Sequence, residues 1–431
     1  MDKQKARDLD DLTLALMIED HFGSENLRKH PSGVWFFDGA VWSLMKEQTL
    51  KAIATDVLAQ QIDQVRDARV KAAISLFKSR HFDEDERFER GDQNVIVLKD
   101  DYYRFDGESW MRVPPDRDLM RRIQLPASYV DDQPSAFNKF LDDILCDPDG
   151  NPRPDASDLR QLIWEMLGYC LVTHAKYEQC FILCGAGANG KSVLGAVAKE
   201  MVGRHHTASV QPNQMGSVFQ RSNLEGKLLN LVTELNQNAE LEDGMLKAVI
   251  SGEMMSVEKK HQDVREIEPF AKHIILTNHM PRIRDYSDGL FRRVSIIPLE
   301  RQFMGSEADP HLIDKLRGEL DAITSRAMDA LGQLIIRNGK FTRPRSSITA
   351  LQEWRLENNH LADFVAEKLY EDPKGTIGVQ AAYDAYVGWF ASTGLRGILG
   401  RKQFSKRLAA LLRMPSKRSA EGYTFQGVSL R

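Results

Sequence analysis

A glycine-rich segment in the middle of the chain constrains its fold and chemistry more than any other feature. Residues 185–192 read Gly-Ala-Gly-Ala-Asn-Gly-Lys-Ser, a complete G-x-x-x-x-G-K-S phosphate-binding loop. In such a loop the glycines let backbone N–H groups point at the phosphates of a nucleoside triphosphate, the lysine reaches the β- and γ-phosphates, and the serine hydroxyl ligates Mg²⁺. An apolar run at 181–184 suits a buried strand and 193–198 can open a helix, which leaves a plain glycine-rich turn as the weaker alternative. The predicted nucleotide contacts are Gly185, Ala186, Gly187, Ala188, Asn189, Gly190, Lys191 and Ser192.

Composition limits the class of protein. The chain has 431 residues, 42% of them hydrophobic and 28% charged, which is typical of a soluble protein of two to four domains. No apolar stretch is long enough for a membrane span, and the polar start is unlike a signal peptide. The four cysteines form no C-x-x-C pair, so neither a zinc site nor a disulfide framework is predicted. We expect a cytoplasmic protein of a bacterial or phage-infected cell, with no membrane partner.

Positive charge is concentrated at the C-terminus, although the whole chain has a net charge of −4. Residues 396–431 hold nine Lys or Arg against one acid, a local charge of +8. Apolar residues at helical spacing, including Leu361 to Leu369 and Phe404 to Leu412, predict three helices, and a hairpin follows. This outline is that of a winged-helix module, in which the third helix enters a DNA groove. Its predicted DNA contacts are Arg401, Lys402, Lys406 and Arg407; a solvated basic face is the alternative.

The N-terminal third contains two similar segments. Residues 35–42 and 103–110 each carry an aromatic run, then Asp-Gly, then Trp, which predicts two hairpins with two-residue turns. We expect both hairpins to pack their aromatic rings in one α+β domain. Core packing explains these rings better than a base-stacking platform does.

Three further strands are predicted after the phosphate-binding loop. Residues 228–234 end in Glu234, where an acid that holds Mg²⁺ or polarises the attacking water is expected. Residues 273–278 end in Asn278, whose amide can hydrogen-bond the γ-phosphate or the water. The third strand, 294–297, directly follows Arg292 and Arg293. Between the first two strands, 256–267 could form a β-hairpin with a basic tip.

In this order, the motifs from 185 to 299 resemble the superfamily 3 helicase core of the phage and plasmid primase–helicase family, which includes the poxvirus-type enzymes. The matching pieces are the G-x-x-x-x-G-K-S loop, Val-Thr-Glu-Leu-Asn at 232–236, Leu-Thr-Asn-His-Met-Pro-Arg-Ile at 276–283 and Asp-Gly-Leu-Phe-Arg-Arg at 288–293. The resemblance implies a homo-hexameric ring that uses ATP to move on single-stranded DNA, typically 3′ to 5′, during replication of a mobile element. Larger members carry a primase domain for which this chain has no room, so a separate primase or other replication protein is an expected partner. Asn236 stands near where a second acid is often found, so Mg²⁺ ligation rests on Ser192 and Glu234.

We therefore predict an α/β protein in three parts. An N-terminal α+β domain spans 1–135, a helical collar with an AAA+-like ATPase and a mostly parallel central sheet spans 136–340, and a basic winged-helix-like domain spans 341–431. The predicted catalytic residues are Lys191, Glu234 and Asn278 of one subunit, with Arg293 or Arg292 supplied by its neighbour. The predicted pore contacts with single-stranded or forked DNA are Lys260 and His261, with Lys259 as the weaker candidate because strand alternation would point it away from Lys260.

Each of these assignments has an alternative. The arginines could form ion pairs within the chain, and the hairpin tip could be a solvated turn. Two other function classes stay open as well. One is an ATP-switched initiator or loader that binds origin DNA without unwinding it, and the other is an ATP-dependent assembly or immunity factor. The basic hairpin favours the helicase, since neither alternative needs it.

Overall fold

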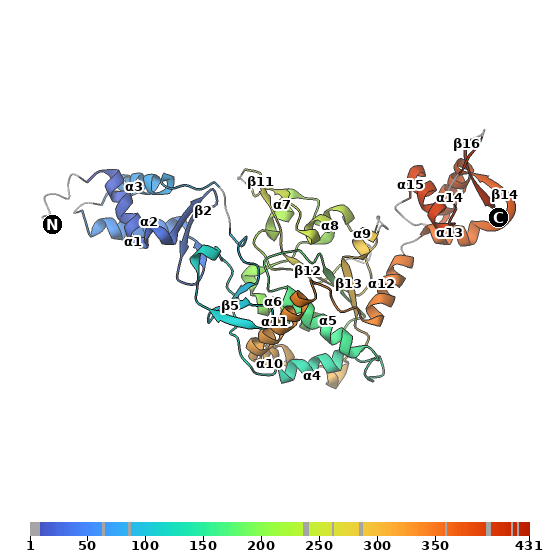
Figure 1. Cartoon of the computed structure of the whole chain (residues 1–431), viewed down its shortest axis with the longest axis horizontal. Helices are drawn as coiled ribbons and strands as arrows, with labels where there is room; N and C mark the ends of the chain where they lie inside the picture. Colours follow the sequence, from blue (N-terminus) through green and yellow to red (C-terminus); the bar gives the residue numbers. More distant parts are fainter. Residues whose placement is uncertain are drawn as a thin grey trace.

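The computed structural model describes residues 9–62, 65–84, 88–235, 241–260, 263–283, 288–357, 360–393, 398–414, 417–419 and 422–431. Figure 1 shows three groups of elements along the longest axis, with the N-terminal group at one end, the large sheet in the middle and the C-terminal group at the other end. In the described part of the chain, no helix is long and apolar enough to cross a membrane.

The N-terminal group combines three helices with a three-stranded antiparallel sheet. Its elements are α1 (Asp11–Phe22), β1 (Leu27–His30), β2 (Gly33–Phe37), β3 (Trp42–Leu44), α2 (Glu47–Ala59) and α3 (Asp67–Ser79). The Asp10 carboxylate caps α1 by accepting a hydrogen bond of 2.7 Å from the Thr13 N–H. Leucine, isoleucine and alanine side chains from the inner faces of all three helices pack into one core with Leu27 and Val34 of the sheet.

The two Asp-Gly segments form hairpins, but their turns are longer than predicted. The second hairpin belongs to a sheet of β4 (Val95–Val97), β5 (Tyr102–Phe105) and β6 (Trp110–Val113). Phe37 pairs with Trp42 and Phe105 pairs with Trp110, so each turn has four residues rather than two. The reason is that the aspartate carboxylates at 38 and 106 each accept two backbone N–H groups of the turn, which stabilises the wider loop.

The second hairpin packs on the central group rather than beside the first hairpin. The Trp110 indole N–H donates a hydrogen bond of 2.7 Å to the carbonyl of Met328 in α11 (Leu320–Ile336). Phe105 lies against Gly332 of the same helix, where a Cβ would come within 2.7 Å of the ring. The aromatic rings of the two hairpins therefore belong to different clusters, and Trp35 and Trp42 pack with Phe88 instead. The domain boundary at about residue 135 stays a prediction.

A five-stranded sheet forms the middle of the molecule, and every neighbouring pair of its strands is parallel. In spatial order its strands are β13 (Val294–Pro298), β7 (Cys180–Cys184), β12 (Lys272–Thr277), β9 (Leu229–Val232) and β8 (Thr207–Ala208). Alternate residues of each strand enter two different apolar clusters, one on each face. The predicted α/β sheet is confirmed as a P-loop-like arrangement, and β9 ends two residues before Glu234.

Helices cover both faces of this sheet, and a short hairpin stands apart from it. The helices are α4 (Ser135–Ile144), α5 (Ala156–Tyr169), α6 (Lys191–Val202), α7 (Val218–Arg221), α8 (Asp243–Ser251), α9 (Asp288–Phe291), α10 (Leu312–Gly318), α11 (Leu320–Ile336) and α12 (Arg345–Glu357). The hairpin is β10 (Met255–Val257) with β11 (Arg265–Ile267). Short 3₁₀ turns lie at Ser24–Asn26, Arg117–Leu119, Arg204–His206, Pro212–Gln214, Ser222–Leu224 and Gly305–Glu307.

The C-terminal group differs from the prediction by one strand. Its elements are α13 (His360–Lys368), β14 (Leu369–Gly378), α14 (Val379–Thr393), α15 (Arg401–Leu411), β15 (Lys417–Ser419) and β16 (Gly422–Leu430). Leu369 was expected on the apolar stripe of the first helix, but it starts β14 and pairs with Leu430. Its spacing from Phe364 and Val365 imitates a helical stripe, although its side chain enters the same core from the sheet. The antiparallel sheet order is β14-β16-β15.

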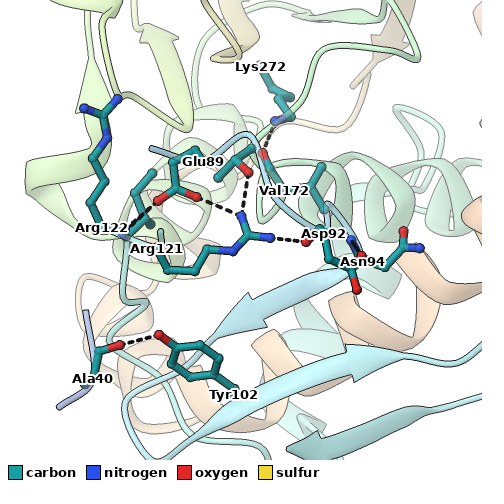
Figure 2. A network of polar contacts seen from close by, with 11 residues as sticks. Ala40, Glu89, Asp92, Asn94, Tyr102, Arg121, Arg122, Val172 and Lys272 are labelled. Atoms are coloured by element: carbon teal, nitrogen blue, oxygen red, sulfur yellow. Dashed lines mark hydrogen bonds and ion pairs between the residues drawn. The ribbon is translucent and has the colours of Figure 1, made fainter. Parts of the chain in front are cut away.

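A buried ion pair of the N-terminal third, Arg121 with Glu89, contacts the central group through Thr173 (Figure 2). The Arg121 guanidinium donates hydrogen bonds to the Glu89 carboxylate at 2.8 Å and to the Thr173 hydroxyl at 3.0 Å, and a further one to the Asp92 carbonyl. The other Glu89 oxygen accepts the backbone N–H groups of Arg122 and Ile123. Both ionic side chains are about 2% exposed, so these additional hydrogen bonds compensate the loss of water around them.

Candidate active site and nucleic-acid interface

The phosphate-binding loop lies between β7 and the first turn of α6, as predicted. Two of its glycines are required by close contacts. A Cβ at Gly185 would lie 2.0 Å from the Leu299 carbonyl oxygen, and Gly190 has a φ of +84° with Ile144 2.6 Å from the position of a Cβ. Gly187 has no atom within 4 Å of that position, and the backbone of 186–188 is exposed. The loop thus presents open backbone in front of a helix N-terminus, which is a favourable place for phosphate.

Lys191 lies at the mouth of this loop. Its ammonium donates hydrogen bonds to the carbonyls of Gly185 at 2.6 Å and Ala186 at 3.1 Å and to the Asn189 side-chain oxygen at 2.9 Å. Burial lowers the pKa of Lys191, because the charged form loses water there. Ser192 is exposed in the first turn of α6, beside it. These three acceptors are uncharged oxygens of the loop itself. Negatively charged phosphate oxygens would bind the ammonium more strongly.

A segment just after β13 fixes the loop from the other side. The Asn189 amide donates a hydrogen bond of 3.0 Å to the Leu299 carbonyl. The Phe303 N–H donates to Ala188 at 2.7 Å, and the Gln302 amide donates to the Gly187 carbonyl at 2.9 Å. We missed these residues in the sequence, since they follow the loop by more than a hundred positions and no motif marks them. Only one signal in the sequence could have indicated these residues. Residues 299–303 directly follow a predicted strand, and this strand pairs in parallel with β7, so its end lies beside the loop.

Asn278 and Glu234 extend from the same edge of the sheet as the phosphate-binding loop. Because β12 lies between β7 and β9 and all three are parallel, the loop, Asn278 and Glu234 follow one another along the carboxyl edge. The Gly185 N–H donates a hydrogen bond of 3.3 Å to the Thr277 carbonyl, which joins the loop to the end of β12. Asn278 and Glu234 are both exposed. Asn236, which we expected near the position where a second acid is often found, lies outside the described residues.

Arg292 and Arg293 are at the opposite edge of the sheet. Val294, the next residue, pairs with Cys180 at the start of β7, so the arginines lie at the amino ends of the strands. Arg293 is held within its own chain. It donates to the Ser251 hydroxyl at 3.0 Å and the Gly289 carbonyl at 2.6 Å, and it forms an ion pair of 2.8 Å with Glu178. Arg292 is exposed. The structure therefore does not bring either arginine to the phosphate-binding loop of the same subunit.

The hairpin expected to carry DNA contacts is present as β10 and β11. Lys260 is exposed at its tip, whereas His261 lies outside the described residues. Lys259 forms an ion pair of 2.9 Å with Glu225, a residue of the loop before β9. The buried Arg221 of α7 supports the hairpin by donating to the Ser256 carbonyl at 3.0 Å. The hairpin is thus held by Glu225 and by Arg221 of α7.

Four basic residues of the C-terminal group lie on α15. Phe404 and Leu408 enter the core, while Arg401, Lys402 and Lys406 are exposed and Arg407 is half-buried. Arg401 also donates a hydrogen bond of 2.6 Å to the Gln380 side chain of α14. The described residues contain no cluster of three His, Cys, Asp or Glu that would form a preformed metal cage. The metal candidates stay Ser192 and Glu234.

Comparisons with known proteins point in the same direction. A family of unknown function (DUF5906) matches residues 183–293, the stretch from the loop to the arginines. The chain is 24% identical over 252 residues to Putative helicase 184R of Invertebrate iridescent virus 6 and 23% identical over 264 residues to Putative helicase 022R of Frog virus 3 (isolate Goorha). These matches cover 49% and 56% of the chain, and the chain spans only about a quarter of each relative, 26% and 27%. The chain is therefore similar, over about half its length, to helicase-like viral proteins.

The fold also has relatives among solved structures. An apo structure of the NrS-1 C-terminal region matches 97% of the chain and 99% of its own length, with a TM-score of 0.52 and 12% identity. A second apo structure, the A form of the same region, has a TM-score of 0.52 over 94% of the chain and 85% of that structure. At this identity the likeness concerns the fold, and it extends over all three groups of elements.

Proposed function

We propose that the chain is the ATPase and motor part of a ring-shaped DNA helicase of superfamily 3 type. It would move 3′ to 5′ during replication of a phage, plasmid or other mobile element. One observation carries this proposal: the parallel sheet places the phosphate-binding loop, Asn278 and Glu234 in succession along one edge. The helicase names of the viral relatives agree with it.

The loop fits ATP and Mg²⁺. Its exposed backbone at 186–188 and the open space at Gly187 admit phosphate oxygens, and the Lys191 ammonium already has an all-oxygen environment. Mg²⁺ in such sites takes one or two protein ligands, with phosphates and water completing the shell. Ser192 and Glu234 therefore suffice, and a preformed cage is not needed. When bound, ATP with Mg²⁺ supplies the phosphoanhydride whose cleavage drives the cycle.

Each residue then has a defined task. Lys191 turns from the loop carbonyls to the phosphate oxygens and neutralises negative charge there. Glu234 orients and polarises the attacking water, and Asn278, between the loop and Glu234, donates its amide hydrogens to the water or the terminal phosphate. An additional positive charge is still needed in the transition state. Because Arg292 is exposed at the far edge of the sheet, it would reach the site of an adjacent subunit and not its own.

This geometry is the reason for proposing a ring of identical subunits, with six as the expected number. A head-to-tail interface repeats the contact between the arginine edge of one subunit and the loop edge of the next, and it closes into a ring. The β10–β11 hairpin would line the centre and hold DNA phosphates through Lys260 and His261. The C-terminal group, a winged-helix module in this proposal, would bind duplex DNA through α15.

Direct observation of the assembly tests the proposal. The protein is mixed with a non-hydrolysable ATP analogue and forked DNA, and its native mass and particle images are recorded. We expect six subunits around one strand. An initiator or loader would instead bind duplex origin DNA and show no strand through a ring, and an assembly factor would show no DNA-dependent ring. Either of these results contradicts the helicase assignment.

A further inference from the structure

The base of the β10–β11 hairpin carries a cluster of positive charge, of which the assignments above use only Lys259. Lys259 and Arg265 both form ion pairs with one carboxylate, Glu225, in the loop that leads to β9. Lys227 lies two residues further along this loop. Its ammonium donates a hydrogen bond to the His205 carbonyl. Two cations therefore share one carboxylate, and a third cation lies two residues from that carboxylate along the chain.

The strand register separates Arg265 of this cluster from one acid of the hairpin, Glu266. Val257 pairs with Arg265, and Ser256 pairs with Glu266. Since directly paired residues of antiparallel strands point to the same face, Arg265 lies on the face of the buried Val257, and Glu266 lies on the other face. The face that carries Arg265 is turned toward Glu225. The register thus places Arg265 and Glu266 on opposite faces of the hairpin.

The positive charges are close enough to disfavour one another. Lys227 is half-buried, and its pKa is lowered first by burial and then by the charge of Lys259. Glu225 is 18% exposed and already shared by two partners, Lys259 at 44% and Arg265 at 32% exposure. The cluster is therefore accessible to solvent and has less negative than positive charge. An anion placed between Lys227 and Lys259 would relieve this repulsion.

We propose that Lys227, Lys259 and Arg265 form a phosphate-binding site for the backbone of a single DNA strand, and that Glu225 competes with the strand for the two hairpin cations. The inference rests on the proposed DNA-translocating function and adds a second contact to the exposed tip at Lys260. A strand that touches the tip and this site would be held at two points on one side of the hairpin. Glu225 would hold the two cations in position when the strand is absent.

Because Glu225 competes with the DNA strand, two variants of this cluster should change DNA affinity in opposite directions. Binding of a fluorescent oligothymidylate is measured with the full chain and a non-hydrolysable ATP analogue over a series of salt concentrations. Lys227→Gln should weaken binding and flatten the slope of log K against log salt by about 0.7, the value for one phosphate contact on a single strand. Glu225→Gln should tighten binding and steepen the slope, because both hairpin cations become available. Lys227→Arg should retain the wild-type slope.

Matched controls come from an ion pair elsewhere. Lys315 and Asp309 pair at 2.6 Å beside α10, with exposures of 60% and 36%, so Lys315→Gln and Asp309→Asn repeat the same charge changes. Both should leave binding unchanged. Inorganic tripolyphosphate, tested on the Lys191→Ala background, separates a strand from a small phosphate ligand, and we expect it to displace the oligonucleotide only weakly.

The outcomes distinguish this inference from the proposed function. If the wild-type protein binds the oligonucleotide and Glu225→Gln weakens binding, or if Lys227→Gln changes nothing, the phosphate site is wrong and the helicase proposal stands. Strong competition by tripolyphosphate that is lost in Lys227→Gln also overturns the assignment to a DNA strand. No binding by the wild-type protein overturns both.

Discussion

In the proposed mechanism, Lys191 serves nucleotide binding and Glu234 serves turnover. Lys191→Ala should abolish ATP hydrolysis, since phosphate charge would lack its ammonium. Glu234→Gln should keep ATP binding and stop turnover, which would trap the assembled ring. Steady-state hydrolysis and binding of a fluorescent ATP analogue measure the effects of both variants. Hydrolysis near the wild-type rate in Lys191→Ala would mean that the phosphate-binding loop is assigned incorrectly.

The two adjacent arginines should behave differently. Arg292→Ala should leave stability within about 0.5 kcal/mol and lower hydrolysis by roughly 10³-fold, the size expected for an arginine that acts in the transition state. Arg293→Ala should instead destabilise the chain by about 1–3 kcal/mol, because it removes hydrogen bonds to Ser251 and Gly289 and the ion pair with Glu178. Denaturant unfolding measures the second effect.

Mixing experiments then test action between subunits. Arg292→Ala and Lys191→Ala subunits are each inactive alone, but a mixed interface can pair an intact loop with an intact arginine. Partial recovery of hydrolysis is expected on mixing. If subunits exchange and activity does not recover, Arg292 does not act on a neighbour.

Lys272 should make stability depend on pH. Its side chain is buried at the start of β12, donates to the Phe270 and Val172 carbonyls and lies 4.9 Å from the ring of Tyr169 (Figure 2). Burial lowers its pKa from 10.5 to about 7. Above this value the folded state has released a proton that the unfolded state still binds, so stability should rise between pH 7 and 9, by at most about 1.4 kcal/mol per pH unit.

Lys272→Met isolates this effect from other titrating groups. Urea unfolding of both proteins at pH 7 and pH 9 should show a smaller rise in the variant. An equal rise in the two proteins would mean that Lys272 keeps its proton in the folded state.

At the scale of elements, α12 belongs with the ATPase sheet and not with the C-terminal group. Trp354 of this helix is 1% exposed, donates a hydrogen bond of 2.8 Å to the Pro281 carbonyl and packs in the same cluster as β13. Removing residues after 357 should therefore leave the ATPase folded and weaken duplex DNA binding with a flatter salt dependence. Removing residues after 344 should cost about 3–5 kcal/mol, as for loss of a buried tryptophan.

Circular dichroism melts and hydrolysis without DNA distinguish the two truncations. Equal melting temperatures would show that α12 does not stabilise the sheet. Unchanged duplex binding after the shorter truncation would reassign the basic C-terminal group to a structural or protein-binding role.

Local sequence patterns were sufficient to predict the residues along the carboxyl edge of the sheet, but not the residues that hold the phosphate-binding loop in place. The glycine spacing, the apolar runs and their polar ends predicted the loop, Glu234 and Asn278 on one parallel sheet. The contact of Asn189 with Leu299 joins residues 110 positions apart, and no periodicity signals such a pairing. Leu369 was wrongly predicted to lie in a helix, because a strand residue whose side chain enters the same core can fall at helical spacing. Glu225 was missed for a related reason, since its partners come from a hairpin far along the chain.

At the scale of the whole molecule, the proposed function combines a nucleotide site at one edge of the sheet, an exposed arginine at the other edge and a basic hairpin. The N-terminal third contacts the central group through the hydrogen bond from Arg121 to Thr173. In the proposed function, these features act together only if ATP hydrolysis moves the DNA strand. Coupling between hydrolysis and strand separation is thus the central claim.

Strand displacement from a forked DNA with a labelled strand tests this claim most directly. With ATP and Mg²⁺, the wild-type chain should release the labelled strand, faster from a fork with a free 3′ single-stranded arm, and Lys191→Ala should release none. If the wild-type chain hydrolyses ATP in the presence of the fork and releases no strand, the chain is not a helicase.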